Sequence, residues 1–379
     1  MGTKNNPMSE FSAADHAYMA RALQLAERGL YTTTPNPRVG CVIVKDDAVV
    51  GEGWHEIAGS PHAEVHALAQ AGAQARGATA YVTLEPCSHH GRTPPCADAL
   101  LAAGVGRVVV AMEDPNPLVA GSGLRRLQEA GVAVASGLMQ TQAEALNPGF
   151  IRRMRDERPY VRCKLAMSLD GRTAMASGES KWITGAAARE DVQRLRARSC
   201  AIVTGIGTVL ADDPNLTVRF PLPGGHERQP LRVVLDPRLS MPESSRLLAQ
   251  PGGVLVVTAC DEKAARQRLE QAGAEVVHLP HGLDRVDLEG TLALLSTRQV
   301  NEVLLETGAT LSGAMLQAGL VDELIIYMAP LLMGDAARGL FRLPGMERME
   351  QRIELNITDL RAVGKDWRIT ARVEQKANA

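Results

Sequence analysis

The sequence is poor in aromatic residues and has no strong excess of either charge. Aromatic side chains make up 3% of its 379 residues, and the formal net charge is −2. Residues 1–150 hold 10 Lys/Arg and 14 Asp/Glu, a charge of −4, and the remainder carries +2. A protein that binds nucleic acid needs a basic surface, and many single-strand binders also stack bases on aromatic rings. This composition argues against a nucleic-acid-binding protein.

Long apolar runs and crowded cysteines are also missing from the sequence. No segment reaches the roughly 18 apolar residues of a membrane span. The polar stretch from Met1 to Glu10 lacks the apolar core of a signal peptide. Six cysteines are spread from Cys41 to Cys260, unlike the compact framework of a disulfide-rich protein. We therefore expect an enzyme of the cytoplasm that makes no membrane contact.

Helical and strand-like segments alternate along the chain, which indicates an α/β layer fold. A charge run ended by proline, Arg152–Pro159, resembles a connector, so we place a domain boundary near residue 150. The expected parts are a disordered terminus over 1–12 and domains over 13–150 and 151–379. In the first domain the pattern predicts helices over 15–28, 63–72, 97–103 and 123–130, and strands over 39–44, 48–53, 78–84, 105–112 and 132–136. In the second it predicts strands over 160–166, 200–204, 231–235, 253–258, 276–279, 303–306 and 324–329.

His62, Cys87 and Cys96 are candidate ligands of a catalytic zinc ion. Zinc with three protein ligands keeps a fourth position open for water, whereas structural zinc takes four protein ligands. Glu64 lies two residues after His62, where it could move protons between that water and a substrate amine. The pattern is close to the base-deaminase signature, but eight residues separate the two cysteines where that signature has two.

Two glycine pairs follow expected strands and could bind phosphate through backbone amides at a helix start. Gly205-Ile-Gly207 lacks the third glycine of a dinucleotide fingerprint, because position 210 is Leu. Gly308–Gly313 lacks the lysine of a P-loop. On the residues alone, tight turns remain the simpler interpretation of these glycines.

Several blocks of sequence resemble the family of bifunctional riboflavin-biosynthesis deaminase/reductases. In the first half these blocks are Thr34–Gly40, Gly51–His55, Pro61–Ala67, Val82–Cys96 and Asp114–Pro117, and in the second half Leu165–Ala174, Ser180–Thr184, Val203–Pro214 and Glu306–Gly313. In that family the wide gap between the cysteines is normal. The resemblance implies a cytidine-deaminase-like three-layer α/β/α domain, followed by a dihydrofolate-reductase-like α/β domain that uses NADPH.

The resemblance also implies a reaction sequence and its site residues. The zinc-dependent step is hydrolytic deamination of 2,5-diamino-6-ribosylamino-4(3H)-pyrimidinone 5′-phosphate, with Glu64 as the catalytic residue, and reduction of the ribosyl group to ribityl follows. Deaminase substrate positions are Asn36, His55, His89, Arg92, Asp114 and Asn116. Cofactor positions are Ala166, Trp182, Thr208, Asp212, Gly308, Ala309, Thr310, Leu311, Ser312, Gly313 and Ala314. Reductase substrate positions are Lys164, Ser180, Arg196, Leu216, Arg219 and Glu306.

Partners and alternatives complete these expectations. We expect one zinc ion per chain, NADPH, a small phosphorylated aminopyrimidine as substrate, and a homo-oligomer. One alternative is a nucleic-acid editing zinc deaminase with a binding second domain, which the charge balance disfavours. Another is a zinc-stabilised binding protein without activity, which would have no need of Glu64.

Overall fold

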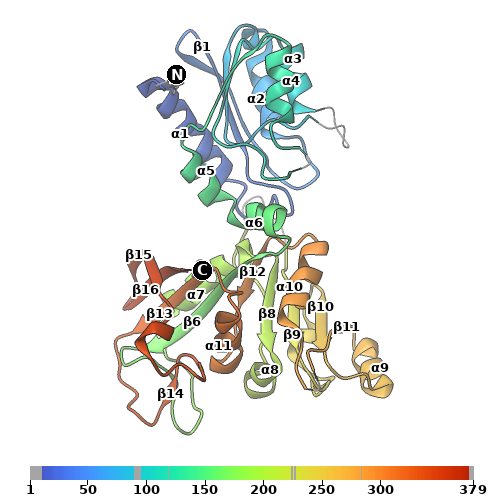
Figure 1. The fold of residues 1–379 in the computed structure, drawn as a ribbon, viewed down its shortest axis with the longest axis vertical. Coiled ribbons are helices and arrows are strands. Elements are labelled where there is room, and N and C mark those ends of the chain that lie inside the picture. Colours follow the sequence, from blue (N-terminus) through green and yellow to red (C-terminus); the bar gives the residue numbers. More distant parts are fainter. Residues whose placement is uncertain are drawn as a thin grey trace, which may run out of the picture. The chain divides into compact units, whose positions relative to one another are not determined.

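The computed structural model describes residues 11–88, 95–117, 119–222, 225, 228–282 and 284–374. The chain divides into two compact units, Met1–Asp156 and Glu157–Ala379, each with its own sheet and core (Figure 1). Residues 1–10, most of the terminus expected to be disordered, lie outside the described residues, whereas Ser12 caps the first helix. Among the described residues, no helix has the length and apolar character needed to cross a membrane.

The first unit is built on a five-stranded sheet with the order β2-β1-β3-β4-β5. Its strands are β1 Gly40–Lys45, β2 Ala48–Trp54, β3 Thr79–Val82, β4 Arg107–Val110 and β5 Ala133–Ser136. The strands expected over 39–44 and 48–53 are confirmed as a hairpin: β1 and β2 pair antiparallel, and both turn residues, Asp46 and Asp47, have positive φ. Aspartate tolerates this left-handed conformation better than bulky residues do.

Helices cover both faces of this sheet. They are α1 Ala13–Glu27, α2 Ala63–Ala71, α3 Cys96–Ala102, α4 Ser122–Glu129, α5 Gln140–Leu146 and α6 Pro148–Asp156. Because side chains alternate along a strand, Cys41 and Ile43 pack with α2, α3 and α4, whereas Val42 and Val44 pack with α1 and α5. The expected three-layer α/β/α arrangement is therefore present.

The expected connector is wrong in its first half, because Arg152–Asp156 forms the last turns of α6. Phe150 and Ile151 anchor this helix in the core of the first unit. An ion pair between Arg152 and Asp156, at i and i+4, supports the charged face. A run of charges ended by proline is typical of a connector. Here these charges lie on one side of a helix, and the apolar residues that anchor this helix come just before them.

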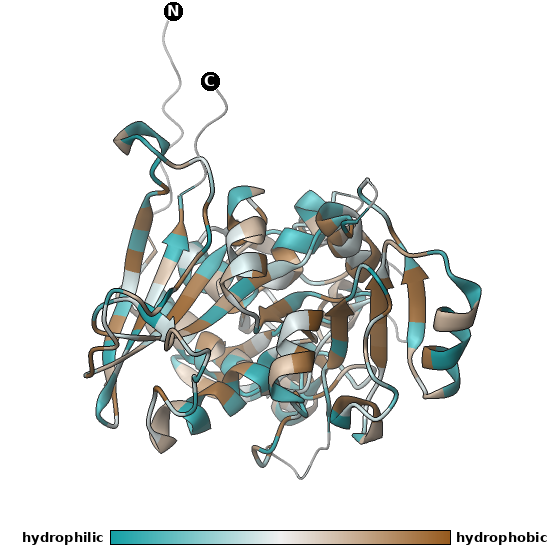
Figure 2. Cartoon of the chain, turned by 90° about the horizontal axis from the view of Figure 1, so that it is seen from below, coloured by the Kyte–Doolittle hydropathy of each residue, from teal (hydrophilic) through white to brown (hydrophobic). Residues whose placement is uncertain are grey.

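The second unit contains a nine-stranded sheet with the order β11-β10-β9-β8-β12-β6-β13-β16-β15. The strands are β6 Tyr160–Ser168, β8 Ala201–Gly205, β9 Leu231–Leu235, β10 Val254–Thr258, β11 Glu275–His278, β12 Glu302–Leu305, β13 Glu323–Ala329, β15 Leu355–Val363 and β16 Asp366–Val373. Those from β11 to β13 run parallel, and β16 and β15 are added antiparallel at one edge. Figure 2 shows the central parallel strands of this sheet largely in brown, as expected for strands covered on both faces, whereas teal and brown alternate along the strands at one edge.

Two layers of helices enclose the parallel strands. Side chains of α10 Leu288–Thr297 and α11 Ala309–Gln317 share a cluster with one face of the sheet. Those of α7 Ala186–Arg198, α8 Ile206–Asp212 and α9 Lys263–Gln271 pack on the other face. The seven expected strands of this unit are present, whereas the β15–β16 hairpin and a small pair, β7 Arg172–Ala174 with β14 Arg338–Gly339, were not predicted.

Candidate metal centre and cofactor site

Two helix starts and one strand end hold the three predicted zinc ligands. His62 is the N-cap residue of α2, Cys96 is the first residue of α3, and Cys87 follows β3. Helix α2 begins very close to β2, since a Cβ atom at Gly53 would lie 2.3 Å from the carbonyl oxygen of Ala63. Only glycine permits that approach, which fixes the position of the residue that precedes α2.

The ligand atoms of His62, Cys87 and Cys96 all lie within 4.8 Å of one another. His62 Nδ1 is 3.2 Å from Cys96 Sγ and 3.6 Å from Cys87 Sγ, so Nδ1 is the nitrogen that faces the sulfurs. An imidazole and two thiols are a donor set that suits zinc. Within the described residues this group has only these three members, so the donor set fits a metal with an open coordination position.

In the absence of a metal, the pKa values of the two thiols are shifted in opposite directions. A hydrogen bond from Cys96 holds the pKa of the Cys87 thiol well below its usual range, and the same interaction raises the pKa of Cys96. The hydrogen bond to Cys87 in turn raises the pKa of His62. One negative sulfur is therefore already favoured, which prepares the site for a cation.

Glu64 lies on the first turn of α2 and is only 3% exposed. Burial raises the pKa of its carboxyl to about 6. Its carboxyl is within hydrogen-bonding range of the Cys96 thiol. A buried carboxyl with a pKa shifted toward neutrality, beside a metal-binding group, suits a residue that accepts and returns a proton.

Asn36 and His55 form a chain of contacts that reaches His62. His55 is 2% exposed; its Nδ1 is 3.2 Å from the Pro61 carbonyl oxygen and its Nε2 is 3.1 Å from Asn36 Nδ2. The first contact requires a proton on Nδ1, so Nε2 accepts from the Asn36 amide. The rings of His55 and His62 meet edge to face, 5.4 Å apart. Both predicted substrate residues are thus next to the metal group.

Asp114 and Asn116 lie in the segment after β4, where the Asn116 amide donates to Asp114 Oδ1 at 2.9 Å. The Asp114 amide donates to Glu85 Oε2 at 3.0 Å, which ties this segment to the residues before Cys87. Sequence reasoning missed Glu85, although a carboxyl two residues before a metal ligand at a strand end was a usable signal. His89 and Arg92 lie outside the described residues.

Three predicted reductase residues come together from separate elements of the second unit. Arg196 on α7 forms a two-point ion pair with Glu306, which follows β12, through Nε–Oε1 at 2.6 Å and Nη2–Oε2 at 3.0 Å. Burial lowers the pKa of Lys164 on β6, and its charge interacts with Glu306 and Arg196. Burial opposes ionisation of Glu306, but the charge and hydrogen bond of Arg196 and the charge of Lys164 together outweigh burial and lower the pKa of Glu306.

The segment that contains residues 216–219 lies beside Arg196, and its side chains differ in their exposure. Arg196 Nη1 donates to the Thr217 carbonyl at 3.1 Å, so its guanidinium is engaged by Glu306 and Thr217. Arg219 has an exposed side chain, and its backbone amide donates to Gln193 on α7. Leu216 is buried in the cluster beneath α7. Arg219 is therefore more accessible to a phosphate than Arg196 is.

Trp182 and Asp212 belong to a more exposed part of the second unit. The Trp182 side chain is 70% exposed, and the Arg189 guanidinium lies 4.6 Å from its ring centroid. Asp212, at the end of α8, pairs with Lys181 at 2.9 Å. Ser180, Thr208 and Ala166 are half-buried. An exposed aromatic ring held by a cation is available for stacking on a ligand.

Residues 308–314 do not all face the same way. Gly308 precedes α11, and Gly308 and Thr310 are exposed, whereas Ala309, Leu311 and Ala314 are half-buried. Ser312 is fully buried and accepts from the Cys163 thiol, and a Cβ at Gly313 would lie 2.1 Å from the Arg342 carbonyl oxygen. The start of α11 is therefore the part of this segment that can meet a phosphate, through its unpaired amides.

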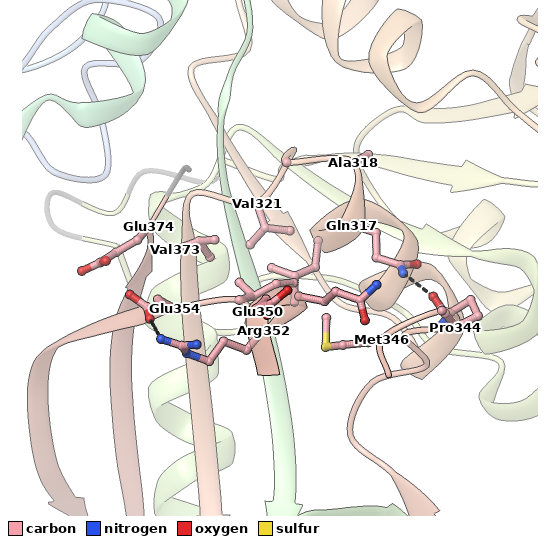
Figure 3. Close-up of a pocket in the computed structure, with 15 residues that line it drawn as sticks. Gln317, Ala318, Val321, Pro344, Met346, Glu350, Arg352, Glu354, Val373 and Glu374 are labelled. Atoms are coloured by element: carbon pink, nitrogen blue, oxygen red, sulfur yellow. Dashed lines mark hydrogen bonds and ion pairs between the residues drawn. The ribbon is translucent and has the colours of Figure 1, made fainter. Parts of the chain in front are cut away.

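A groove of about 1170 Å³ lies elsewhere in the second unit (Figure 3). It is lined by the carboxyl end of α11, around Gln317, by the segment that contains Glu350, Arg352 and Glu354, and by the end of β16. Glu306 and Gly308, at the amino end of α11, are not among its lining residues. The size of this groove therefore says nothing about the predicted reductase site.

Comparison with known proteins identifies both units. Residues 12–112 match the cytidine and deoxycytidylate deaminase zinc-binding region, and residues 159–369 match the RibD C-terminal domain. The riboflavin biosynthesis protein RibD of Escherichia coli K12 is 54% identical over 361 residues, covering 93% of this chain and 97% of that protein. The chain belongs to the RibD family.

Solved structures agree over nearly the whole chain. A RibD from Acinetobacter baumannii is 50% identical with a TM-score of 0.89, covering 96% of this chain and 99% of that one. A deaminase/reductase from Thermotoga maritima is 32% identical with a TM-score of 0.83, covering 95% and 99%. The first unit is thus the zinc-binding, cytidine-deaminase-like domain of a bifunctional riboflavin-biosynthesis enzyme, and the second is its dihydrofolate-reductase-like domain, which uses a nicotinamide cofactor.

Proposed function

We propose that the protein deaminates 2,5-diamino-6-ribosylamino-4(3H)-pyrimidinone 5′-phosphate and then reduces the ribosyl side chain with NADPH, giving 5-amino-6-ribitylamino-uracil 5′-phosphate. The observation that carries the first step is the buried Glu64 beside His62, Cys87 and Cys96. A structural zinc site has no need of a buried carboxyl there. RibD relatives along the full chain support the pairing of the two steps.

For the deaminase we propose one zinc ion per chain, held by His62 Nδ1, Cys87 Sγ and Cys96 Sγ. When bound, zinc supplies the Lewis acidity that makes water a nucleophile near neutral pH. Glu64 takes the proton of that water and returns it to the departing amine. Asn36, His55, Asp114 and Asn116 hold the pyrimidine and ribose, and His89 and Arg92, outside the described residues, are proposed phosphate-side contacts.

For the reductase we propose that the start of α11, with Ala166, Trp182, Thr208 and Asp212, binds NADPH. When bound, NADPH supplies the hydride that reduces the ribose carbon. The exposed Arg219 is the proposed phosphate ligand, because a free guanidinium binds phosphate at two points. A charged cluster of Lys164, Glu306 and Arg196 lies beside the ribose in this proposal. The remaining proposed substrate residues are Ser180 and Leu216. The protein's task here is to hold donor and acceptor at a reactive distance.

A nucleic-acid editing function is not retained, because the RibD relatives extend over both units and the net charge of −2 shows no basic excess. The two metal-binding thiols must stay reduced, which supports the expected cytoplasmic location.

We also infer a homo-oligomer that forms through one face of the β15–β16 hairpin. Ile357 is 60% exposed, Leu360 57% and Trp367 44%. Opposite residues on paired strands share a face, and the pairs Ile357–Ala371, Leu360–Ile369 and Ala362–Trp367 all fall on the same one. An irregularity between Ile357 and Asp359 keeps this apolar face in phase along the strand. On β16 this face is partly covered, because Ala371 is 1% exposed and Ile369 packs against the core of the unit. Its exposed apolar part, at Ile357, Leu360 and Trp367, favours burial against a second copy.

The proposal is tested with zinc-loaded protein and the diaminopyrimidine substrate, by following ammonia release and then NADPH consumption. Both signals, with reduction dependent on prior deamination, are expected. If zinc-loaded protein releases no ammonia from this substrate but deaminates cytidine nucleotides, the proposed substrate is wrong and a cytidine nucleotide takes its place.

A further inference from the structure

Glu85 is a buried carboxyl in the first unit that has no role in the chemistry proposed above. It follows the end of β3, two residues before the metal ligand Cys87, and is 5% exposed. Its own backbone amide donates to the Met112 carbonyl at 3.0 Å, so this residue already lies beside the end of β4. A buried carboxyl is costly unless its oxygens are satisfied by donors.

Each carboxylate oxygen of Glu85 accepts hydrogen bonds from the segment that follows β4. Oε2 accepts from the amides of Asp114 at 3.0 Å and Gly121 at 2.9 Å. Oε1 accepts from the amides of Gly123 at 2.8 Å and Leu124 at 3.4 Å. The Glu85 side chain is thus hydrogen-bonded to both ends of the loop that holds Asp114 and Asn116, and to the start of α4.

Two further contacts seat the same loop on the residues around Cys87. A Cβ atom at Gly123 would lie 2.0 Å from the Pro86 carbonyl oxygen, so the start of α4 touches the backbone next to the metal ligand. The hydroxyls of Ser88 and Ser122 are 2.6 Å apart. The loop and the strand end that holds Cys87 are therefore one packed assembly, with Glu85 at its centre.

We infer that Glu85 is a positioning residue that sets the distance between the metal ligand Cys87 and the substrate residues Asp114 and Asn116. This inference rests on the proposed substrate role of those two residues. Glu85 touches neither substrate nor metal and acts through the loop. A displacement of about 1 Å at substrate-holding groups can reduce catalysis about 100-fold.

The four donors make this site specific for a carboxylate. A glutamine at position 85 has the same shape but replaces one acceptor oxygen with an NH₂ group. In either orientation of the amide, that NH₂ faces two backbone N–H donors, so the hydrogen bonds on that side are lost. Glu85→Gln should therefore release one end of the loop without leaving a cavity.

The variant is compared with wild type and with Glu113→Gln, which removes an exposed carboxyl from the same loop. For Glu85→Gln we expect a rise in the deaminase KM of about 10- to 100-fold with a smaller change in kcat. We expect zinc content to stay at the wild-type level and NADPH oxidation by the second unit to be unchanged. Glu113→Gln should match wild type. Wild-type KM in Glu85→Gln, or loss of zinc as its main defect, would overturn the inference.

Hydrogen exchange on the wild-type protein tests the inference without relying on the variant to fold. The amides of Asp114, Gly121 and Gly123 should exchange much more slowly than exposed loop amides, in peptides resolved by mass spectrometry. Rapid exchange at these amides in the wild type means that Glu85 does not hold the loop, and the inference fails. If the diaminopyrimidine is not a substrate but the amides are protected, the proposed function is wrong, while the hydrogen bonds by which Glu85 holds the loop are supported.

Discussion

Arg196 and Glu306 meet in a largely buried two-point ion pair, with their side chains 13% and 10% exposed. Lys164, which is half-buried, adds a second cation that interacts with the same carboxylate. Removing one partner of such a group leaves a buried charge without compensation, which is far more costly than breaking a surface pair. Glu306 is therefore the anion that compensates the charges of both Arg196 and Lys164.

Glu306→Gln should reduce NADPH oxidation strongly while deamination continues, because it leaves Arg196 and Lys164 without their anion. We expect a stability loss of about 3 kcal/mol in the second unit. The matched control is Glu275→Gln, which removes an exposed partner of Arg298 in the same unit and should cost less than about 1 kcal/mol. The two activities are measured separately on each variant. Equal effects of the two substitutions on NADPH oxidation would contradict this role of Glu306.

Glu64→Gln should retain zinc and lose ammonia release by about 100- to 10,000-fold, the range for removal of a general acid–base. The amide keeps the shape of the side chain but cannot take a proton from water. Glu56→Gln, a nearby exposed carboxyl, serves as control. Metal analysis and an ammonia assay decide the outcome, and ammonia release that persists in Glu64→Gln would exclude Glu64 as the base.

The strands of both units and the metal group followed from the sequence because each has a local signal. Continuous apolar runs predicted the parallel strands, and the order of His62, Glu64, Cys87 and Cys96 predicted the metal group. The β15–β16 hairpin escaped prediction because its apolar residues alternate across an irregularity, and several of them, Ile357, Leu360 and Trp367, are exposed. No local pattern marked it as part of the sheet.

Contacts between distant segments were the least predictable part of the candidate site. The resemblance supplied both Arg196 and Glu306, but their pairing depends on α7 lying next to the end of β12. The resemblance gave Arg196 only as a reductase substrate position and did not reveal that Glu306 and Thr217 engage its guanidinium. Glu85 was overlooked although it lies two residues before Cys87, and its role as an acceptor could not be predicted because its four donors come from residues 29 to 39 positions away.

Removal of the metal should make Cys87 the first cysteine to react with an alkylating reagent. Its pKa is lowered by the hydrogen bond from Cys96, and the thiolate is the reactive form. Cys41 is fully buried, and burial raises the pKa of its thiol, so it should stay unmodified until the protein unfolds. Peptide mass spectrometry after chelation measures both sites. If Cys41 reacts as fast as Cys87, chelation has unfolded the unit rather than emptied the site.

Asp15 should stabilise the first unit only above acidic pH. Burial opposes its ionisation, but hydrogen bonds from Arg107, Tyr81 and Ser12 outweigh burial and lower its pKa well below the usual range. For a lowered pKa, the contribution is present above the unfolded-state value of about 3.9 and is lost as pH falls toward the folded-state value. Asp15→Asn should thus cost about 1.5–3 kcal/mol near neutral pH.

The stability gap between wild type and Asp15→Asn should narrow as the pH falls below about 4. Denaturant unfolding at several pH values measures it, with Asp47→Asn in the exposed β1–β2 turn as control. Acid also releases the metal from both proteins, so only their difference is informative. A gap that stays constant into strong acid would show that folding does not lower the pKa of Asp15.

Ile357→Asp should shift the protein toward a smaller species, because it places a charge at the centre of the apolar face on β15. Val49→Asp is the matched control, since Val49 is 45% exposed on β2, an edge strand of the other unit. Sedimentation at several protein concentrations measures the mass of each variant, and both activities show whether each unit remains folded. We expect the Val49 variant to keep the wild-type mass. If wild type sediments as a monomer at every concentration, or if Ile357→Asp keeps the wild-type mass, this face is not the contact between copies of the chain.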